Sequence, residues 1–273
     1  MDYVEIQGEK VPALGIGTWQ LKGEECEETV KTALEKGYRH VDTAQIYDNE
    51  EQVGQAISDS DVSRDEIWLT TKVWTSNFEH DSVIKSVNES LEKLQTHYVD
   101  LLLIHWPSEE IPFEETIKAM ESLVESGQVR NIGISNFTTE QMEKAQEVAS
   151  KDIFTNQVEY HPFLNQDAVL EKCREKDMML TAYSPLARGE VMGNKVLKEI
   201  ADKYDKSEAQ VALRWLIQQE NVAAIPKAST ENHIEQNFEI FDFTLTNEEV
   251  EEINELKNEN NRYVDPDFAP NWD

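Results

Sequence analysis

The sequence predicts an α/β fold in which eight parallel strands close into a (β/α)₈ barrel. Short β-branched or leucine-rich runs alternate with amphipathic stretches of helical period along the chain, and the runs number eight. No G-x-G-x-x-G motif, typical of a doubly wound sheet, occurs. A length of 273 residues suits one barrel, and no Pro/Gly/Ser-rich linker interrupts it. Residues 1–273 are therefore expected to form a single domain.

The predicted elements follow in chain order. The opening stretch from Val4 to Val11 is typical of a β-hairpin that precedes the barrel. The eight predicted strands are Leu14–Gly17, Tyr38–Val41, Ile67–Lys72, Val99–Ile104, Asn131–Ile134, Asn156–Val158, Met179–Tyr183 and Val222–Pro226. The predicted helices between them include Cys26–Lys36, Asp81–Leu94, Ile117–Ser126, Thr139–Ala149, Ala168–Lys176 and Ser207–Gln219.

The helix predicted from Asp81 to Leu94 illustrates the pattern. Its apolar residues form one stripe that would pack on the sheet, and they are Val83, Ile84, Val87, Leu91 and Leu94. Asp81 is expected to cap its amino end.

The charge balance excludes some partners. The chain carries 25 Lys and Arg against 55 Asp and Glu, a formal net charge of −30. This charge opposes binding to nucleic acid or to an anionic membrane. It also destabilises a compact state in dilute buffer, whereas about 1 M salt would screen it. A salt-adapted source is the interpretation we favour, and an ordinary acidic protein with solvated helix faces is the alternative.

Targeting signals and cysteines point to the cytoplasm. The first residues show no secretory signal, and no apolar run approaches the ~20 residues that span a bilayer. Cys26 and Cys173 lie far apart in helical stretches, which indicates free thiols rather than a disulfide framework or a metal site. We expect a soluble cytoplasmic protein without a metal.

Three predicted strands end in titratable residues. Asp42, Lys72 and His105 lie at these ends, and Tyr47 follows on the next loop. Because barrels of this class place their active sites at the carboxyl ends of strands, the four should converge. A phenol with a pKa of about 10 is a poor acid until positive charge stabilises its phenolate, which Lys72 can supply. Asp42 would hold the lysine and His105 would orient a carbonyl oxygen.

Each residue alone has a simpler explanation: an ion pair, a packed tyrosine or a core histidine. Together, however, they predict polar reduction of a carbonyl with Tyr47 as general acid. The run from Gly37 to Gly54 resembles the aldo-keto reductase family, whose tetrad of aspartate, tyrosine, lysine and histidine falls at these places. The resemblance covers nearly the whole chain, and the chain resembles small prokaryotic members such as 2,5-diketo-gluconate reductase and aldehyde reductase-like enzymes. It implies an NAD(P)H-dependent carbonyl reductase, with the hairpin at the barrel bottom and a monomer as the simplest oligomeric state.

The resemblance also implies a nicotinamide cofactor site. Ser135, Asn136 and Gln157 resemble the clamp on the carboxamide, and Tyr183 resembles the tyrosine that stacks under the ring. Gly133, in the same stretch as Ser135, is also explained by close packing inside a barrel strand. Tyr183 could likewise have a purely structural role. The other residues implied at the cofactor are Thr18, Asp42, Ser184, Leu186, Arg188, Ile225, Lys227, Ser229, Thr230, His233, Gln236 and Asn237.

The end of the last strand is expected to bind phosphate. Lys227 precedes a helical stretch that begins near Glu231, so a full charge lies beside backbone N–H groups. NADP-binding relatives usually carry other residues at the places of Ala228, His233 and Gln236. These differences weaken the predicted recognition of a 2′-phosphate and of adenine, because histidine cannot form the paired hydrogen bonds and the stacking contact of an arginine guanidinium. NADPH is the expected cofactor, with NADH possible.

The substrate pocket is expected to be aromatic. Trp19, Trp74 and Trp106 follow the first, third and fourth strands, and with Tyr47 and His105 they resemble the family's pocket lining. Phe78 is a further candidate. The polar stretch Asn258–Asp273 resembles the family's mobile tail, and its shortness suggests a fairly open pocket.

Two other functions are weighed against this one. Some relatives bind nicotinamide nucleotide mainly to regulate a partner, although the complete tetrad argues against that function here. A metal-dependent lyase or hydrolase built on His105 would require more histidines at strand ends, and His161 lies at some distance after its strand.

Overall fold

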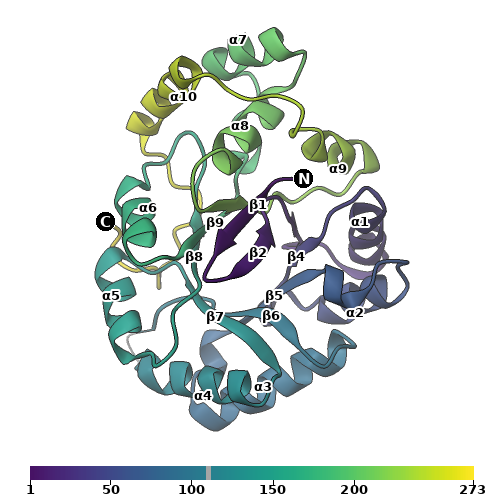
Figure 1. Ribbon diagram of the computed structural model, residues 1–273, viewed down its shortest axis with the longest axis vertical. Coiled ribbons are helices and arrows are strands. Elements are labelled where there is room, and N and C mark those ends of the chain that lie inside the picture. Colours follow the sequence, from purple (N-terminus) through teal and green to yellow (C-terminus); the bar gives the residue numbers. More distant parts are fainter. Residues whose placement is uncertain (109–111) are drawn as a thin grey trace.

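Eight parallel strands run around the centre of the molecule in chain order, as Figure 1 shows. The computed structural model describes residues 1–108 and 112–273. The sheet closes because Leu14 pairs in parallel with Ala224, whose carbonyl accepts the Gly15 N–H at 2.9 Å. The predicted barrel is confirmed. Its strands are β3 (Ile16–Gly17), β4 (His40–Asp42), β5 (Trp68–Val73), β6 (Val99–Ile104), β7 (Val129–Ser135), β8 (Thr155–Glu159), β9 (Met179–Tyr183) and β10 (Val222–Ala224).

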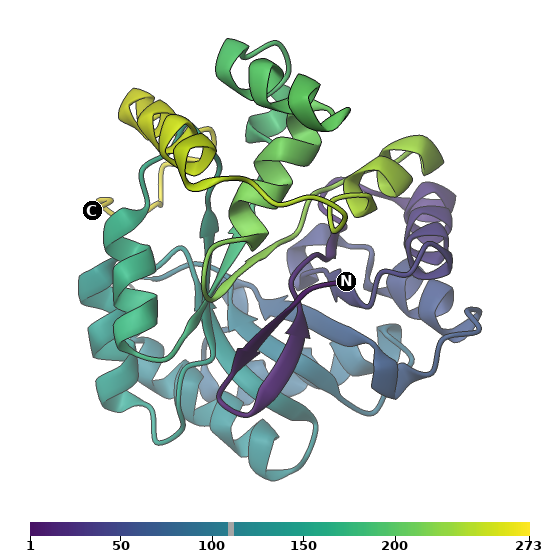
Figure 2. The ribbon, with the colours of Figure 1, turned by 45° about the horizontal axis from the view of Figure 1, so that its top comes forward.

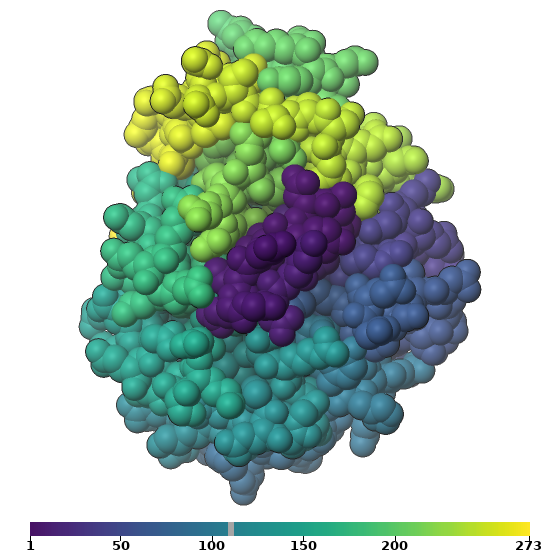
Figure 3. All heavy atoms as spheres, viewed as in Figure 1, coloured from purple at the N-terminus to yellow at the C-terminus, as the bar shows by residue number. Residues whose placement is uncertain are grey.

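The predicted hairpin is also confirmed, as β1 (Tyr3–Ile6) and β2 (Glu9–Pro12), which pair antiparallel. The Gln7 side chain donates to the carbonyls of Ile153 and Asp177, which precede β8 and β9. The hairpin therefore lies at the amino ends of the strands, where Figures 1 and 3 show it crossing the barrel. Its inward side chains are buried in the core: Val4, Ile6 and Val11. It closes the end of the barrel opposite the carboxyl ends of the strands.

Helices surround the strands, as Figure 2 shows from a tilted view. They are α1 (Gly23–Glu35), α2 (Glu50–Ser58), α3 (His80–Lys93), α4 (Phe113–Glu125), α5 (Thr139–Val148), α6 (Asp167–Glu175), α7 (Lys195–Tyr204), α8 (Glu208–Ile217), α9 (Glu231–Phe238) and α10 (Asn247–Asn254). The predicted cap of α3 is wrong, because Asp81 lies inside the first turn and Glu79, without a side-chain cap, precedes the helix. Helices α2 and α7 were not among the predicted ones.

The turn between β4 and α2 carries Tyr47 and is held by one buried side chain. The Asn49 side chain donates hydrogen bonds from its amide NH₂ group to the carbonyls of Thr18 and Leu21. Its Oδ1 accepts a hydrogen bond from the Thr43 hydroxyl. These contacts join the loops after β3 and β4 to the start of α2. Tyr47 itself lies in the short 3₁₀ turn Gln45–Tyr47. Its position over the barrel mouth is therefore fixed by the packing of α2.

The tail, residues 258–273, is folded back on the barrel. It lies at the end opposite the hairpin, and in Figure 1 its yellow trace passes beside α5 and α6. The Asn261 N–H donates to the Phe163 carbonyl, and the Asp273 carboxylate accepts the Thr139 N–H at the start of α5. The tail is thus bound near both of its ends, by a residue before α6 and by the first turn of α5.

Candidate active site

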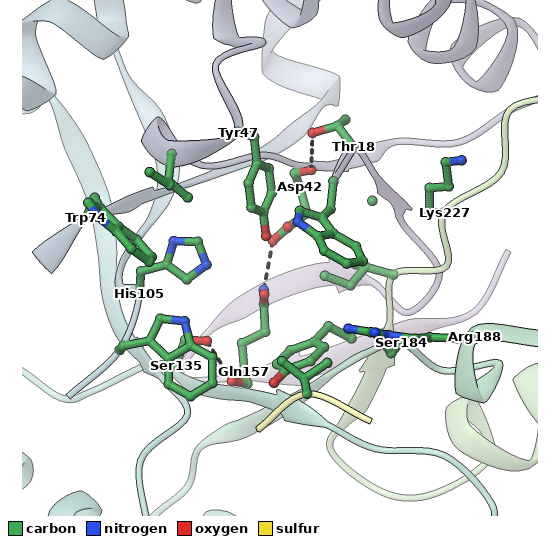
Figure 4. Close-up of a pocket in the computed structure, with 17 residues that line it drawn as sticks. Thr18, Asp42, Tyr47, Trp74, His105, Ser135, Gln157, Ser184, Arg188 and Lys227 are labelled. Carbon is green, nitrogen blue, oxygen red and sulfur yellow. Dashed lines mark hydrogen bonds between the residues drawn. The ribbon is translucent and has the colours of Figure 1, made fainter. Parts of the chain in front are cut away.

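A cavity of about 270 Å³ opens at the carboxyl ends of the strands. Figure 4 shows that one end is aromatic, around Trp74 and His105, and that Arg188 and Lys227 lie toward the other end. The sequence-predicted residues that line it are Thr18, Trp19, Asp42, Tyr47, Trp74, His105, Trp106, Ser135, Gln157, Tyr183, Ser184, Arg188, Ile225 and Lys227. The cavity therefore brings together chemistry-bearing residues from all parts of the barrel.

Lys72 is fully buried beneath Tyr47 and makes three hydrogen bonds. Its Nζ donates to Asp42 Oδ1 at 2.5 Å, to the Thr43 carbonyl at 2.8 Å and to Tyr47 Oη at 3.5 Å. An ammonium has three N–H donors, and a carboxylate and a carbonyl can only accept. Tyr47 Oη consequently accepts from Lys72, and its own O–H is free to point into the cavity.

Asp42 is held from two sides. Its Oδ1 accepts from Lys72, and its Oδ2 accepts the Gln157 amide N–H at 2.7 Å across the barrel. The dashed line between Gln157 and Asp42 in Figure 4 marks this contact. The Thr18 hydroxyl donates to the Asp42 backbone carbonyl at 3.0 Å. Gln157 thus contacts the acidic partner of the lysine, a link that the sequence did not indicate.

The resting pKa of Tyr47 differs from the expected direction. Burial, and after it the Asp42 carboxylate, raises the pKa of Tyr47 well above its ordinary value. Burial also lowers the pKa of Lys72, although Asp42 opposes that change. The pKa of the phenol is therefore not lowered in the resting site, first because the group is buried and second because Asp42 lies nearby. The arrangement keeps Tyr47 protonated and therefore able to donate.

His105 lies beside the phenol, with ring centroids 5.6 Å apart in an edge-on arrangement. Its Nδ1 is buried and has no hydrogen-bond partner among the described residues. Burial, followed by the charge of Lys72, lowers the pKa of His105 well below its usual value. The imidazole is therefore neutral at pH 7 and can donate one hydrogen bond to an oxygen in the cavity.

The residues expected at the nicotinamide lie on β7, β8 and β9. Ser135 and Gln157 line the cavity, and so does Tyr183, whose hydroxyl donates to Asn136 Oδ1 at 2.7 Å. Asn136 is buried behind them and donates to the His105 carbonyl and to Ser135 Oγ. Its amide is thus occupied by protein partners, whereas Gln157 still offers its carbonyl oxygen.

The opposite end of the cavity is basic. Among the ion pairs of residues 1–108 and 112–273, none involves Lys227, although the chain has 55 acidic residues. Lys227 lies just before α9, whose first turn is capped by Thr230. Arg188 lies over the Trp19 ring at 5.3 Å, so it spans the cavity from the loop after β9. A phosphate in this part of the cavity would meet the side chains of Lys227 and Arg188.

The remaining predicted cofactor residues do not line this cavity. Ser229 lies in a separate groove between α1 and α9, beside several glutamates. His233 and Gln236 are exposed on α9, Asn237 on the same helix is buried, and Leu186 packs against the core. An extended dinucleotide that ran from the cavity toward α9 would have to pass these side chains.

The aromatic end of the cavity includes residues that the sequence did not indicate. Trp74 contacts His105, and both Trp74 and Trp106 contact Phe268 of the tail, with ring centroids 6.1 and 5.4 Å apart. Ile46 and Val264 also line the cavity, as does Gly17. Ile46 could have been inferred from its place beside Tyr47, whereas nothing in the sequence places residue 264 near β8. Phe78, the weaker candidate, is buried in the core instead.

The donor set fits a reduced nicotinamide dinucleotide. Tyr183 offers a ring face, Gln157 offers an amide, and Lys227 and Arg188 offer positive charge at the far end. No three His, Cys, Asp or Glu side chains in the described part of the chain form a metal-binding group. None of the described helices is long and apolar enough to cross a membrane.

The chain is similar to known proteins over most of its length. The model of the aldo/keto reductase family matches residues 13–258. Methylglyoxal reductase of Escherichia coli O157:H7 is 43% identical over 267 residues, which cover 96% of this chain and 99% of the relative.

Solved structures are similar over the same length. A protein provisionally assigned as 2,5-diketo-D-gluconic acid reductase B has 49% identity and a TM-score of 0.98, covering 100% of this chain and 98% of its own. The aldo-keto reductase of Bombyx mori in complex with NADP has 33% identity and a TM-score of 0.89, covering 98% of each chain.

Proposed function

This chain belongs to the aldo/keto reductase family and is an NADPH-dependent carbonyl reductase, and we propose that Tyr47 delivers the proton that completes the alcohol. The observation that carries this proposal is the hydrogen bond from Lys72 to Tyr47 Oη, which leaves the phenol proton toward the cavity. When bound, the nicotinamide supplies the hydride to the carbonyl carbon.

Lys72 acts on the phenol through charge. As the proton leaves Tyr47, negative charge grows on an oxygen 3.5 Å from the ammonium, whose attraction is strong in a buried site. Asp42 and the Thr43 carbonyl keep the ammonium at this place. His105, neutral and beside the phenol, would donate to the substrate oxygen and orient the carbonyl toward Tyr47.

The other cofactor contacts are proposed by position. Gln157 and Ser135 would contact the nicotinamide amide, and Tyr183 would lie under the ring. Lys227 and the first turn of α9 would bind the phosphate that distinguishes NADPH from NADH. Ser229, Thr230 and His233 lie along the path toward the adenine end.

We infer that small neutral aldehydes are the preferred substrates, including α-oxoaldehydes such as the methylglyoxal named for a relative. The substrate end is lined by Trp74, Trp106 and Ile46, and the two cations that line the cavity, Arg188 and Lys227, lie toward the other end. A carboxylate on the substrate would find no cationic partner in this wall. The net charge of −30 would also repel it.

A substrate and cofactor panel tests this proposal. Methylglyoxal, a neutral aromatic aldehyde and an anionic keto sugar acid would be assayed with NADPH and NADH at the nicotinamide absorbance. We expect kcat/KM for the neutral aldehydes to exceed that of the acid by about tenfold or more, because only the neutral ones match an uncharged wall. Preference for the acid, or equal use of NADH, would contradict the proposal.

We further propose that residues 1–273 form one domain and that the protein works as a monomer in the cytoplasm of a salt-adapted organism. The acidic composition supports the salt adaptation, and the two free buried thiols support the cytoplasm. Acidic side chains cover outer helix faces such as Glu24 and Glu28 of α1, where salt can screen them.

A further inference from the structure

Glu159, the last residue of β8, is a fully buried carboxylate that plays no part in the chemistry proposed above. It pairs in register with Tyr183 of β9. Most glutamates of this acidic chain lie on the surface, since an uncompensated buried carboxylate is costly. A buried one therefore needs specific donors.

The donors come from the tail. Glu159 Oε1 accepts the backbone N–H of Tyr263 at 2.8 Å, and Oε2 accepts the N–H of Val264 at 2.9 Å. These residues lie more than a hundred positions away in the sequence. Two consecutive N–H groups thus bind the two oxygens of one carboxylate, which fixes both the place and the direction of the tail backbone.

His161 completes the contact, and its tautomer follows from its partners. The Phe163 N–H donates to His161 Nδ1 at 3.3 Å, so the ring proton lies on Nε2 and donates to Glu159 Oε1 at 3.1 Å. The imidazole also packs on the Tyr263 ring, with centroids 5.3 Å apart. Glu159 and His161 therefore form a polar anchor, which we call the tail anchor.

The anchored segment forms part of the substrate wall. Val264 lines the cavity, and Figure 4 shows the yellow chain of the tail passing beside Gln157 and Ser184. Phe268, four residues further on, lies against Trp74 and Trp106. Beyond it, Trp272 contacts Trp106 and Asp273 binds the first turn of α5. The anchor thus fixes one end of a segment whose middle covers the aromatic pocket.

We propose that Glu159 is a positioning residue for substrate selection: by binding the tail backbone, it holds Val264 and Phe268 as one wall of the pocket. This inference rests on the proposed carbonyl reductase site. A large aldehyde reaches the tail wall, whereas a small one is held by Tyr47 and His105 alone. Loss of the anchor should therefore weaken binding of large aldehydes more than that of small ones.

Glu159→Gln is the direct test, because it keeps the size of the side chain. The amide keeps one acceptor oxygen, but its NH₂ group would face a backbone N–H, so two donors would meet and that N–H would lose its acceptor. Glu171→Gln on α6 is the matched control, since it removes the same charge from an exposed site. Phe268→Ala removes the tail's aromatic contact without touching the anchor.

The first readout does not depend on catalysis. Trypsin cleavage after Arg262 releases the peptide 263–273, which mass spectrometry measures under native conditions. We expect Glu159→Gln to be cleaved roughly tenfold faster than the unsubstituted chain, and Glu171→Gln to be unchanged. Equal cleavage rates would overturn the proposed anchor whatever the enzyme's activity.

The second readout separates positioning from general damage. In Glu159→Gln, KM for an aromatic aldehyde should rise about fivefold relative to KM for methylglyoxal. The values of kcat and of the NADPH Kd should stay within about twofold of those of the unsubstituted enzyme. Phe268→Ala should show the same rise, and the double variant should add little to it. Equal changes in both KM values, an additive double variant or a weaker NADPH Kd would each overturn the proposal. If Glu159→Gln does not fold, Val264→Pro removes one tail N–H and takes the trypsin readout alone, because Val264 itself lines the cavity.

Discussion

The proposed chemistry depends on the phenol oxygen of Tyr47 and on the three hydrogen bonds that Lys72 donates. Lys72 has used its three N–H donors on Asp42, Thr43 and Tyr47, which leaves the phenol as the donor toward the cavity. The sequence indicated that these residues meet, but not that burial would raise rather than lower the resting pKa of Tyr47. That direction depends on the depth of the site and on the field of Asp42, which only coordinates provide.

The pH dependence of the reaction follows from the same residues. Burial and Lys72 lower the pKa of His105 well below about 6.5, so the imidazole stays neutral from about pH 6 to about 8. Tyr47 stays protonated over the same range because its pKa is raised. We expect kcat/KM for methylglyoxal to be flat across this range with NADPH saturating. A loss of activity with a midpoint near 6.5 would show that His105 titrates normally.

At the scale of elements, the seating of α2 against α3 positions Tyr47. A Cβ at Gly54 would contact the Lys93 carbonyl and lie 2.6 Å from Leu94 Cα, which is backbone that cannot turn aside. Gly54→Ala should therefore push α2 outward, at a cost of about 2 kcal/mol and about 4–8 °C in Tm. Thermal unfolding measures this, with Glu51→Ala on the exposed face of α2 as the control. A Tm equal to that of the control would contradict this account of the packing.

The elements also show what a sequence can predict. Eight strand runs and most helices were identified because hydrophobic period is a local signal, and β6 and β9 have the predicted bounds. Helix α2 was missed although its motif was recognised, and the cap of α3 was placed at Asp81 instead of Glu79. The contacts of Gln157 with Asp42 and of Glu159 with the tail could not be predicted, since they join positions far apart in the sequence.

At the scale of the whole molecule, the net charge of −30 sets the response to salt. Repulsion among surface carboxylates opposes the compact state, and the Debye length falls from about 10 Å at 0.1 M to about 3 Å at 1 M. We expect Tm to rise by at least about 5 °C between dilute buffer and about 1 M KCl, which corresponds to roughly 2 kcal/mol. Differential scanning calorimetry across KCl concentrations measures the effect. A Tm independent of KCl would remove the argument for salt adaptation.

The most direct test of the central claim is carbonyl reduction by Tyr47→Phe, measured together with NADPH binding. The ring keeps its packing against His105, and only the proton donor is lost. We predict that kcat falls by about a thousandfold while the NADPH Kd stays within about twofold, with Tyr3→Phe on the exposed hairpin as the unaffected control. Turnover within about tenfold of the unsubstituted enzyme would contradict the assignment of Tyr47 as the acid.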